Sequence, residues 1–297
     1  MVKRYIAGGI VIESDIHFPE FVLSDAEPDV RVAYGKVPEE IENVKTQRVL
    51  VQSNDNEVLL KMPGVARYLI EGDSKITLEL LDENRRQDAE RYILTFILGV
   101  LSFKKGFFPL HGGGVVYNGE AYLFTGYSGA GKSTTLAGLA QRGFQPLADD
   151  ISNFFVENGK VYVHPCFPRL KLWKDSLQML KNEGVGEYKL GSDIEKYLVP
   201  LQHEFPKGPI PVKRIYLLQE DREDKIFMRQ VSGKEKLIKL KNNSYKPWMV
   251  KAFSLNQKHF SLMNEIVAKT EFREFHRPMD KKKIDEMYDF LINDIKG

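Results

Sequence analysis

The sequence predicts an α/β protein in which a strand-rich N-terminal domain precedes a core built around a phosphate-binding loop. Short β-type runs, punctuated by Pro and Gly-Asp turns, fill residues 1–84. Further along the chain, the buried-strand pattern 120–125 leads through a glycine-rich turn into the helical pattern 133–142. We therefore expect a first domain over 1–84 and a second over 85–297, which includes a C-terminal region at 206–297.

The individual elements follow from the spacing of apolar residues. Residues 85–101 predict an amphipathic helix that becomes buried, because their apolar side chains recur at intervals of three and four. In the C-terminal region we expect a strand at 213–218 and a helix at 281–292. The expected N-terminal strands are short runs of β-branched and aromatic residues, at 10–12, 30–34, 49–51, 58–62, 66–70 and 76–80.

The glycine-rich turn fills every fixed position of the phosphate-binding pattern G-x-x-x-x-G-K-[ST]. Its glycines let backbone N–H groups surround phosphate oxygens, and the helix N-terminus adds partial positive charge. Lys132 is expected to reach the β- and γ-phosphates, and the Ser133 hydroxyl to meet Mg²⁺. A nucleoside triphosphate is therefore expected to bind at Gly126, Ser128, Gly129, Ala130, Gly131, Lys132, Ser133 and Thr134.

A second glycine-rich element, His111-Gly112-Gly113-Gly114, offers a hydrolase as an alternative. H-G-G-G is an oxyanion-loop motif, and residues 126–130 approach the nucleophile elbow G-x-S-x-G. The elbow fails at its last position, where Ala130 replaces glycine. The connecting residues 115–122 predict a β-hairpin with an Asn-Gly turn, which leaves no room for the elements that separate these motifs in a hydrolase. The hydrolase is therefore disfavoured.

Paired acids follow the phosphate-binding unit. Residues 144–151 predict a second strand that ends in Asp149 and Asp150. Successive side chains of a strand point to opposite faces, so the two carboxylates need not share a role. One is expected to face Mg²⁺, directly or through water, and the other to face an acceptor hydroxyl as a base. A solvated acidic turn is the alternative, and the position directly after the phosphate loop disfavours it.

The amino-acid composition indicates which partners and which cellular compartment to expect. The 297 residues are 42% hydrophobic and 28% charged with a net charge of +2, which gives no case for a nucleic-acid or membrane partner. The single cysteine, Cys166, excludes an internal disulfide and fits a reducing compartment. No apolar span long enough to cross a membrane and no signal peptide is evident. We expect a cytoplasmic protein whose oligomeric state is left open.

These motifs together resemble a known family. His111, the Asn-Gly hairpin, the loop at 126–134 and Ala148-Asp149-Asp150 occur in the order and spacing of the catalytic domain of bacterial HPr kinase/phosphorylase. The resemblance implies a phosphoenolpyruvate-carboxykinase-like P-loop fold, ATP and Mg²⁺ as cofactors, and phosphorylation of a protein serine. It also implies that Lys132 and His111 act at the reacting centre, that Asp149 deprotonates the acceptor serine, and that Asp150 assists the metal together with Ser133.

The sequence departs from that family downstream of the acids. The family's Gly-Leu-Gly signature, preceded by Arg, has no counterpart, and residues 184–186 lack its flanks. Residues 165–173 resemble instead the HPr-kinase-like tailoring kinases encoded beside lasso-peptide precursors, and the segments 5–20 and 273–280 are similar to theirs. This resemblance implies a short precursor peptide as the serine acceptor.

Two cations in that segment are candidates for contact with the substrate or with the transferring phosphoryl group. Arg169 and Lys171 alternate with leucines, so on a strand both charges share one face. Cations near a phosphate loop would stabilise charge on the phosphoryl group, and a solvated face is the alternative.

The expected activity is therefore Mg²⁺-dependent transfer of the ATP γ-phosphoryl group to a serine of a peptide. Two alternatives stay open. One is an HPr serine kinase that acts on a carrier protein, and the other is a nucleotide-binding or ATP-hydrolysing regulator without a phosphoacceptor. The pair Asp149-Asp150 argues against the regulator, because a switch needs no base for an acceptor hydroxyl.

Overall fold

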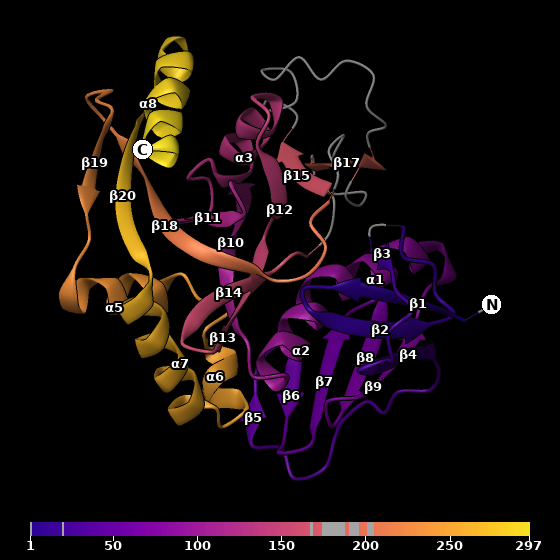
Figure 1. Ribbon diagram of the computed structural model, residues 1–297. Helices are drawn as coiled ribbons and strands as arrows, with labels where there is room; N and C mark the ends of the chain where they lie inside the picture. Colours follow the sequence, from indigo (N-terminus) through magenta and orange to yellow (C-terminus); the bar gives the residue numbers. More distant parts are fainter. Residues whose placement is uncertain (1, 20, 167–168, 174–187, 190–195, 201–204) are drawn as a thin grey trace. The chain divides into compact units, whose positions relative to one another are not determined.

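The computed structural model describes residues 2–19, 21–166, 169–173, 188–189, 196–200 and 205–297. It is a mixed α/β protein with two large sheets, a small three-stranded sheet and few helices, which confirms the predicted fold class at that level (Figure 1). The chain divides into two compact units. The first contains Met1–Phe107 and Lys246–Phe260, and the second contains Phe108–Tyr245 and Ser261–Gly297.

The first unit is built on a nine-stranded sheet, in the order β3-β1-β2-β4-β9-β8-β7-β6-β5. Its pairs are antiparallel except β2–β4 and β4–β9, which are parallel. The run at 49–51 is expected to be a strand, but Val49 and Leu50 form the bend before β6 and Val49 is fully exposed. The strands are β1 (Lys3–Ala7), β2 (Ile10–Ser14), β3 (Val22–Leu23), β4 (Val30–Tyr34), β5 (Thr46–Gln47), β6 (Val51–Ser53), β7 (Glu57–Met62), β8 (Ala66–Glu71) and β9 (Lys75–Leu80).

A helical segment follows this sheet and belongs to the same unit. It comprises η1 (Glu83–Arg85), α1 (Arg86–Tyr92), η2 (Ile93–Ile97) and α2 (Leu98–Lys104), which confirms the predicted amphipathic helix. The Tyr68 hydroxyl donates to the Ala89 carbonyl at 2.6 Å, and the Phe96 ring lies 6.3 Å from that of Trp248 in α6 (Trp248–Ala252). These contacts explain why the first unit extends to Phe107, past the boundary expected at residue 84.

The second unit contains a mixed sheet around two long strands, β10 and β18. β11, β18 and β20 are parallel neighbours, and β10 runs antiparallel to β11. The small sheet has the order β15-β17-β16. The strands are β10 (Phe108–Tyr117), β11 (Glu120–Thr125), β12 (Gln145–Ala148), β13 (Ile151–Glu157), β14 (Lys160–His164), β15 (Arg169–Trp173), β16 (Tyr188–Lys189), β17 (Lys196–Pro200), β18 (Ile210–Asp221), β19 (Phe227–Gln230) and β20 (Glu271–Pro278).

Local sequence explains the hairpin that begins this sheet. Asn118 and Gly119 connect β10 to β11 and have φ of 49° and 76°. A two-residue hairpin turn of type I′ needs positive φ at both positions, and Asn-Gly is the preferred pair. The predicted hairpin is therefore confirmed.

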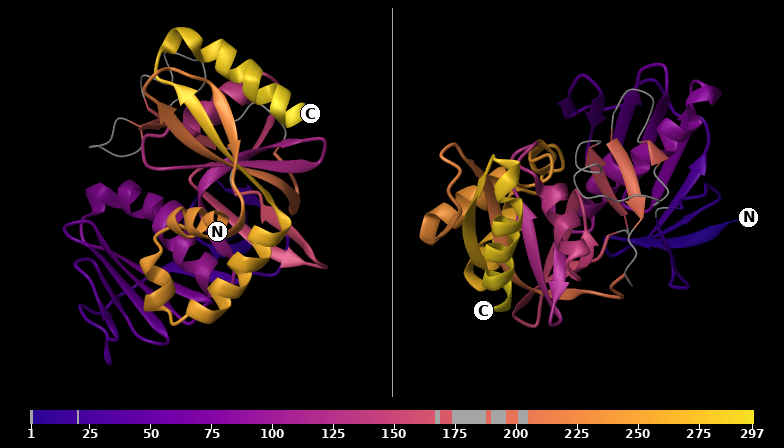
Figure 2. Two further views of the ribbon diagram at one scale, coloured as in Figure 1. Left: turned by 90° about the vertical axis from the view of Figure 1, so that its left-hand side faces the viewer. Right: turned by 90° about the horizontal axis from the view of Figure 1, so that it is seen from above.

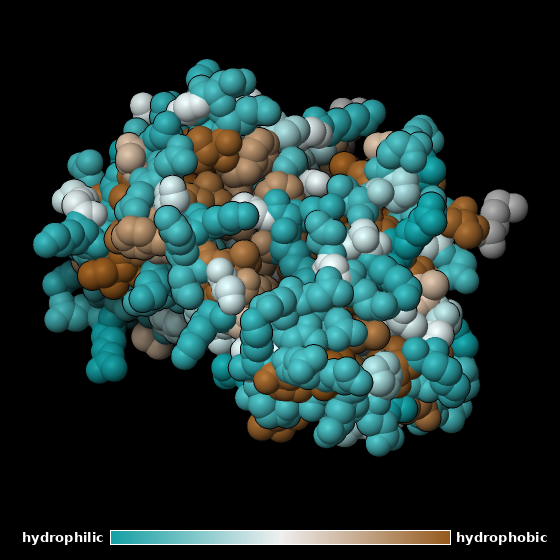
Figure 3. All heavy atoms as spheres, turned by 90° about the horizontal axis from the view of Figure 1, so that it is seen from below, coloured by the Kyte–Doolittle hydropathy of each residue, from teal (hydrophilic) through white to brown (hydrophobic). Residues whose placement is uncertain are grey.

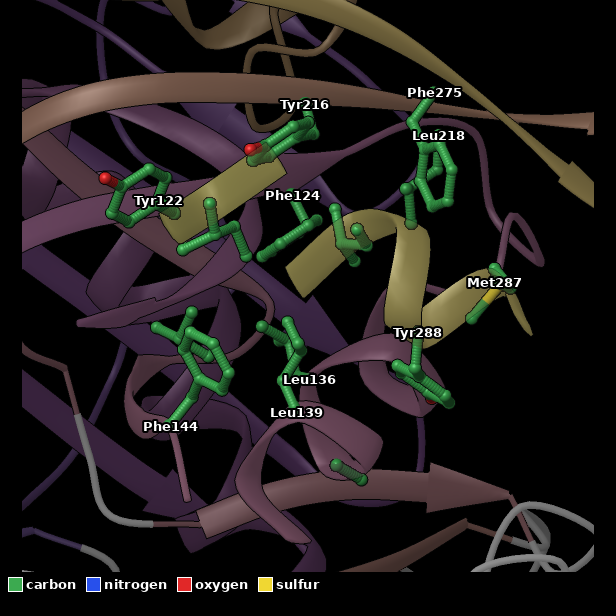
Figure 4. Close-up of a cluster of buried hydrophobic side chains, with 14 of the residues drawn as sticks. Tyr122, Phe124, Leu136, Leu139, Phe144, Tyr216, Leu218, Phe275, Met287 and Tyr288 are labelled. Carbon is green, nitrogen blue, oxygen red and sulfur yellow. The ribbon is translucent and has the colours of Figure 1, made fainter. Parts of the chain in front are cut away.

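Helices α3 (Lys132–Gln141) and α8 (Ile284–Lys296) pack on the sheet of the second unit through one apolar cluster. Leu136 and Leu139 of α3 and Met287 and Tyr288 of α8 gather with side chains of β11, β18 and β20 (Figure 4). α8 lies beside β20 (Figures 1 and 2). The remaining helices of the described residues are α5 (Gly233–Asn242), α7 (Asn256–Lys269) and η3 (Lys281–Lys283).

Tyr288 fixes α8 against the helix that carries the phosphate-loop lysine. Its hydroxyl donates to the Thr134 carbonyl at 2.9 Å, and the ring is buried. A Cβ added at Gly138 would lie 2.1 Å from that ring, so only glycine allows this approach.

Replacing Gly138 with alanine is expected to destabilise the protein. Alanine improves helix propensity by about 1 kcal/mol, but overpacking a buried ring costs about 1–3 kcal/mol, and a contact this short places the cost near the upper value. Urea unfolding should show a lower midpoint. In the double variant Gly138→Ala/Tyr288→Leu the loss should be less than the sum of the single losses, and additive losses would contradict the contact.

Within the described part of the chain, no helix is long and apolar enough to cross a membrane. On the face drawn in Figure 3, hydrophilic residues surround smaller hydrophobic areas.

Candidate functional site

The candidate site lies in the second unit, where three parallel strands end at one edge of the sheet. β11 ends at Thr125, which lies opposite Leu217 of β18. β18 also pairs with β20, and Glu220 lies opposite Arg277 near the ends of these two strands. The segment 126–131 connects β11 to α3 at this edge. Ligands of open α/β sheets bind outside the carboxyl ends of the strands, so the segment 126–131 has the position that this rule describes.

Three glycines of this segment adopt backbone angles that other residues rarely adopt. Gly126, Gly129 and Gly131 have φ of 151°, 95° and 86°, and left-handed Gly131 directly precedes α3. The Lys132 ammonium donates to the carbonyls of Gly126 at 2.9 Å and Tyr127 at 3.0 Å. The cation is therefore folded back over the loop, where it would neutralise phosphate oxygens.

Two oxygen groups meet beside the first turn of α3. The Ser133 hydroxyl donates to Asp149 Oδ1 at 3.0 Å, and Asp149 is only 2% exposed. Nucleotide-bound Mg²⁺ takes one or two protein carboxylates together with phosphates and waters, so this pair fits such an ion. Among the described residues, no group of three or more His, Cys, Asp or Glu side chains is arranged to hold a metal without such help.

The second acid has different surroundings. Asp150 lies in the left-handed region with φ of 79°, in the turn where β10 exchanges β12 for β13 as its partner. Its carbonyl lies 3.1 Å from His111 Nδ1, and its Oδ1 lies 3.5 Å from the same nitrogen. Because a carbonyl only accepts, the first contact requires the proton on Nδ1. Asp150 is therefore in contact with His111, whereas Asp149 accepts from Ser133.

One expectation about this region is corrected. The strand expected over 144–151 is interrupted, because Asp149 and Asp150 form the turn between β12 and β13. His111 lies inside β10, which continues from pairing with β13 to pairing with β12 and β11.

The glycines after His111 have a packing role. A Cβ at Gly113 would lie 2.3 Å from the Ala148 carbonyl and 2.5 Å from Leu136 of α3. The three glycines pair with β11 within the sheet. This close approach accounts for the H-G-G-G sequence without an oxyanion loop, and the hydrolase alternative loses its main support.

A third group at the site was not predicted from the sequence. Arg277 Nε donates to the Ala130 carbonyl at 2.8 Å, and its guanidinium pairs with Glu220. Burial and a hydrogen bond to the same Glu220 raise the pKa of the Tyr127 hydroxyl. The resemblance over 273–280 included Arg277 but did not predict that it lies beside the loop. The pairing of β18 with β20 places it there.

The cationic segment downstream is only partly described. Leu170 and Leu172 of β15 are buried in the cluster that contains α3, and Arg169 is partly exposed. The side chain of Lys171 lies outside the described residues, as do residues 167–168 and 184–186. The segment forms β15, and the substrate contacts of Arg169 and Lys171 stay a prediction.

Comparison with known proteins gives distant similarity to solved structures alone. No family model matches the sequence, and no curated protein matches it. Among solved structures, the Hpr(Ser) kinase/phosphatase from Coxiella burnetii is similar at 13% sequence identity with a TM-score of 0.31. The match covers 64% of this chain and 99% of that chain.

Proposed function

We propose that this chain is a Mg²⁺-dependent kinase that transfers the γ-phosphoryl group of ATP to a serine hydroxyl. One observation carries the proposal. A phosphate loop with Lys132 folded over it lies at the same sheet edge as the contact between Ser133 and Asp149, and Asp150 follows directly beside His111. A cation for phosphates, an oxygen pair for the metal and a separate carboxylate for the acceptor are the parts that phosphoryl transfer needs.

The contacts favour roles for the two acids that are the reverse of those implied by the family resemblance. Asp149 accepts from Ser133, the hydroxyl expected to meet Mg²⁺, so we assign Asp149 to the metal. Asp150 has a side chain that is 25% exposed and lies beside His111, so we assign it as the base. Bound Mg²⁺ would supply charge neutralisation on the phosphate oxygens.

In the proposed reaction, the oxygen of the serine hydroxyl forms a bond to the γ-phosphorus while Asp150 accepts the proton of that hydroxyl. The bond between that phosphorus and the β–γ bridging oxygen breaks, and ADP leaves with the electron pair. Lys132 stabilises the charge that develops on the leaving oxygens. His111 holds the Asp150 turn through its carbonyl contact and thereby orients the carboxylate.

For the acceptor, we propose a serine of a short peptide of the lasso-precursor type. The support is the resemblance over 165–173 together with the position of Arg169 on β15, a strand whose leucines pack against the phosphate-loop helix. An extended peptide would be bound weakly and in part electrostatically, because ordering it costs entropy. The single, buried Cys166 suits the cytoplasm, where ATP is available.

The test is incubation of the protein with Mg·ATP and separate acceptors, read by mass spectrometry. We expect one serine of a precursor peptide to gain a phosphoryl group, and HPr to gain little. Efficient phosphorylation of HPr would mean that the acceptor is a carrier protein and not a peptide, and the proposed kinase activity would still hold. Release of ADP without any modified acceptor would contradict the kinase and favour the ATP-hydrolysing regulator.

A further inference from the structure

The side chain of Arg277 is fixed against the phosphate loop at Ala130 and Gly131. Its Nε–H donates to the Ala130 carbonyl at 2.8 Å, and its guanidinium carbon lies 3.0 Å from the point that a Cβ on Gly131 would occupy. The second anchor is Glu220, its partner in the register of β18 and β20. The Arg277 side chain is only 17% exposed.

The bond to Ala130 sets the direction of the next backbone donor. In a trans peptide, the C=O of Ala130 and the N–H of Gly131 point in opposite directions. A donor that holds the carbonyl from one side therefore turns the Gly131 N–H to the other side. The donor is cationic, so the bond is stronger than one between neutral groups and polarises the peptide that it holds.

Glu220 anchors the guanidinium that makes this bond. Its carboxylate pairs with Arg277, and it also helps to raise the pKa of the Tyr127 hydroxyl near the start of the loop. The ion pair leaves Arg277 with a neutralising partner, which suits a group that acts on the loop and not one that binds phosphate itself.

We propose that Arg277, oriented by Glu220, is a positioning residue that turns the Gly131 N–H toward the phosphates of the bound nucleotide. This inference rests on the proposed function in one respect, namely that the loop binds a nucleotide. It concerns ground-state binding, because the phosphates meet the loop N–H before transfer begins. Loss of Arg277 should therefore raise KM for ATP and leave kcat nearly unchanged.

The test is calorimetric titration of the full chain with Mg·ADP, with steady-state kinetics for ATP. Arg277→Ala should weaken Mg·ADP binding about tenfold, as expected for loss of a charge-assisted hydrogen bond, and kcat should stay within about threefold. Millimolar guanidinium should restore part of the affinity. Arg273→Ala is the matched control, because Arg273 lies on the same strand and pairs with Asp294 away from the loop. It should bind as the wild type does.

Each outcome decides the inference. Unchanged affinity in Arg277→Ala, or an equal loss in Arg273→Ala, would overturn it. If Arg277→Ala does not fold, Glu220→Gln keeps the side-chain shape and should weaken Mg·ADP binding with kcat retained; unchanged binding there would overturn the inference equally. A wild-type protein that binds Mg·ADP but phosphorylates nothing would refute the kinase, and the binding series would still decide the role of Arg277. A wild-type protein that binds no nucleotide would refute both.

Discussion

Lys132→Ala is expected to reduce phosphoryl transfer by about a thousandfold. The Lys132 ammonium lies over the carbonyls of Gly126 and Tyr127, where it would meet the β- and γ-phosphates. No other cation of the loop would take over its role. The measurement is the initial rate of peptide phosphorylation at saturating Mg·ATP.

The control for this change is Lys282→Ala, an exposed lysine just before α8 whose loss should leave the rate unaltered. Circular dichroism of both variants should match the wild type. If Lys132→Ala retained near-normal turnover, the phosphate-loop assignment of residues 126–134 would be wrong.

Asp150→Asn is expected to lower transfer by about two to four orders of magnitude and to keep the affinity for Mg·ATP. Asparagine preserves the shape of the side chain and tolerates the left-handed backbone that Asp150 adopts, with φ of 79°. The change therefore removes the proposed base without reshaping the turn. The measurement pairs single-turnover phosphorylation with calorimetric binding of Mg·ATP.

Asp149→Asn is the matched variant for the neighbouring acid. It should raise the Mg²⁺ concentration needed for half-maximal rate, because Asp149 bonds Ser133 at the proposed metal position. A titration of the rate against free Mg²⁺ separates the two variants. The reverse pattern, with the metal requirement raised in Asp150→Asn and the base lost in Asp149→Asn, would restore the roles that the family resemblance implies.

Those parts of the site that depend on local sequence could be predicted. The turn chemistry of Asn118-Gly119 acts over two residues, and the observed hairpin follows it. The alternation of Leu170 and Leu172 likewise gave a strand with both leucines buried.

Parts that depend on long-range pairing could not be predicted. Glu220 and Arg277 meet only because β18 and β20 pair in one register, and the stretch between them folds into β19, α5, α6 and α7. The separate surroundings of Asp149 and Asp150 arise from the exchange of partners by β10. Residues 246–260 join the first unit although they are distant from it in sequence. None of these contacts follows from the spacing of residues along the sequence.

The most direct test of the central claim is a crystal structure of the protein with Mg²⁺ and a non-transferable ATP analogue. We predict that the phosphates lie within residues 126–133, with Lys132 on the terminal phosphates and the ion held by Ser133 and Asp149. Asp150 should lie on the open side of the γ-phosphate, where an acceptor hydroxyl would approach in line. Nucleotide bound elsewhere on the chain, or phosphates that do not contact the loop, would contradict the account.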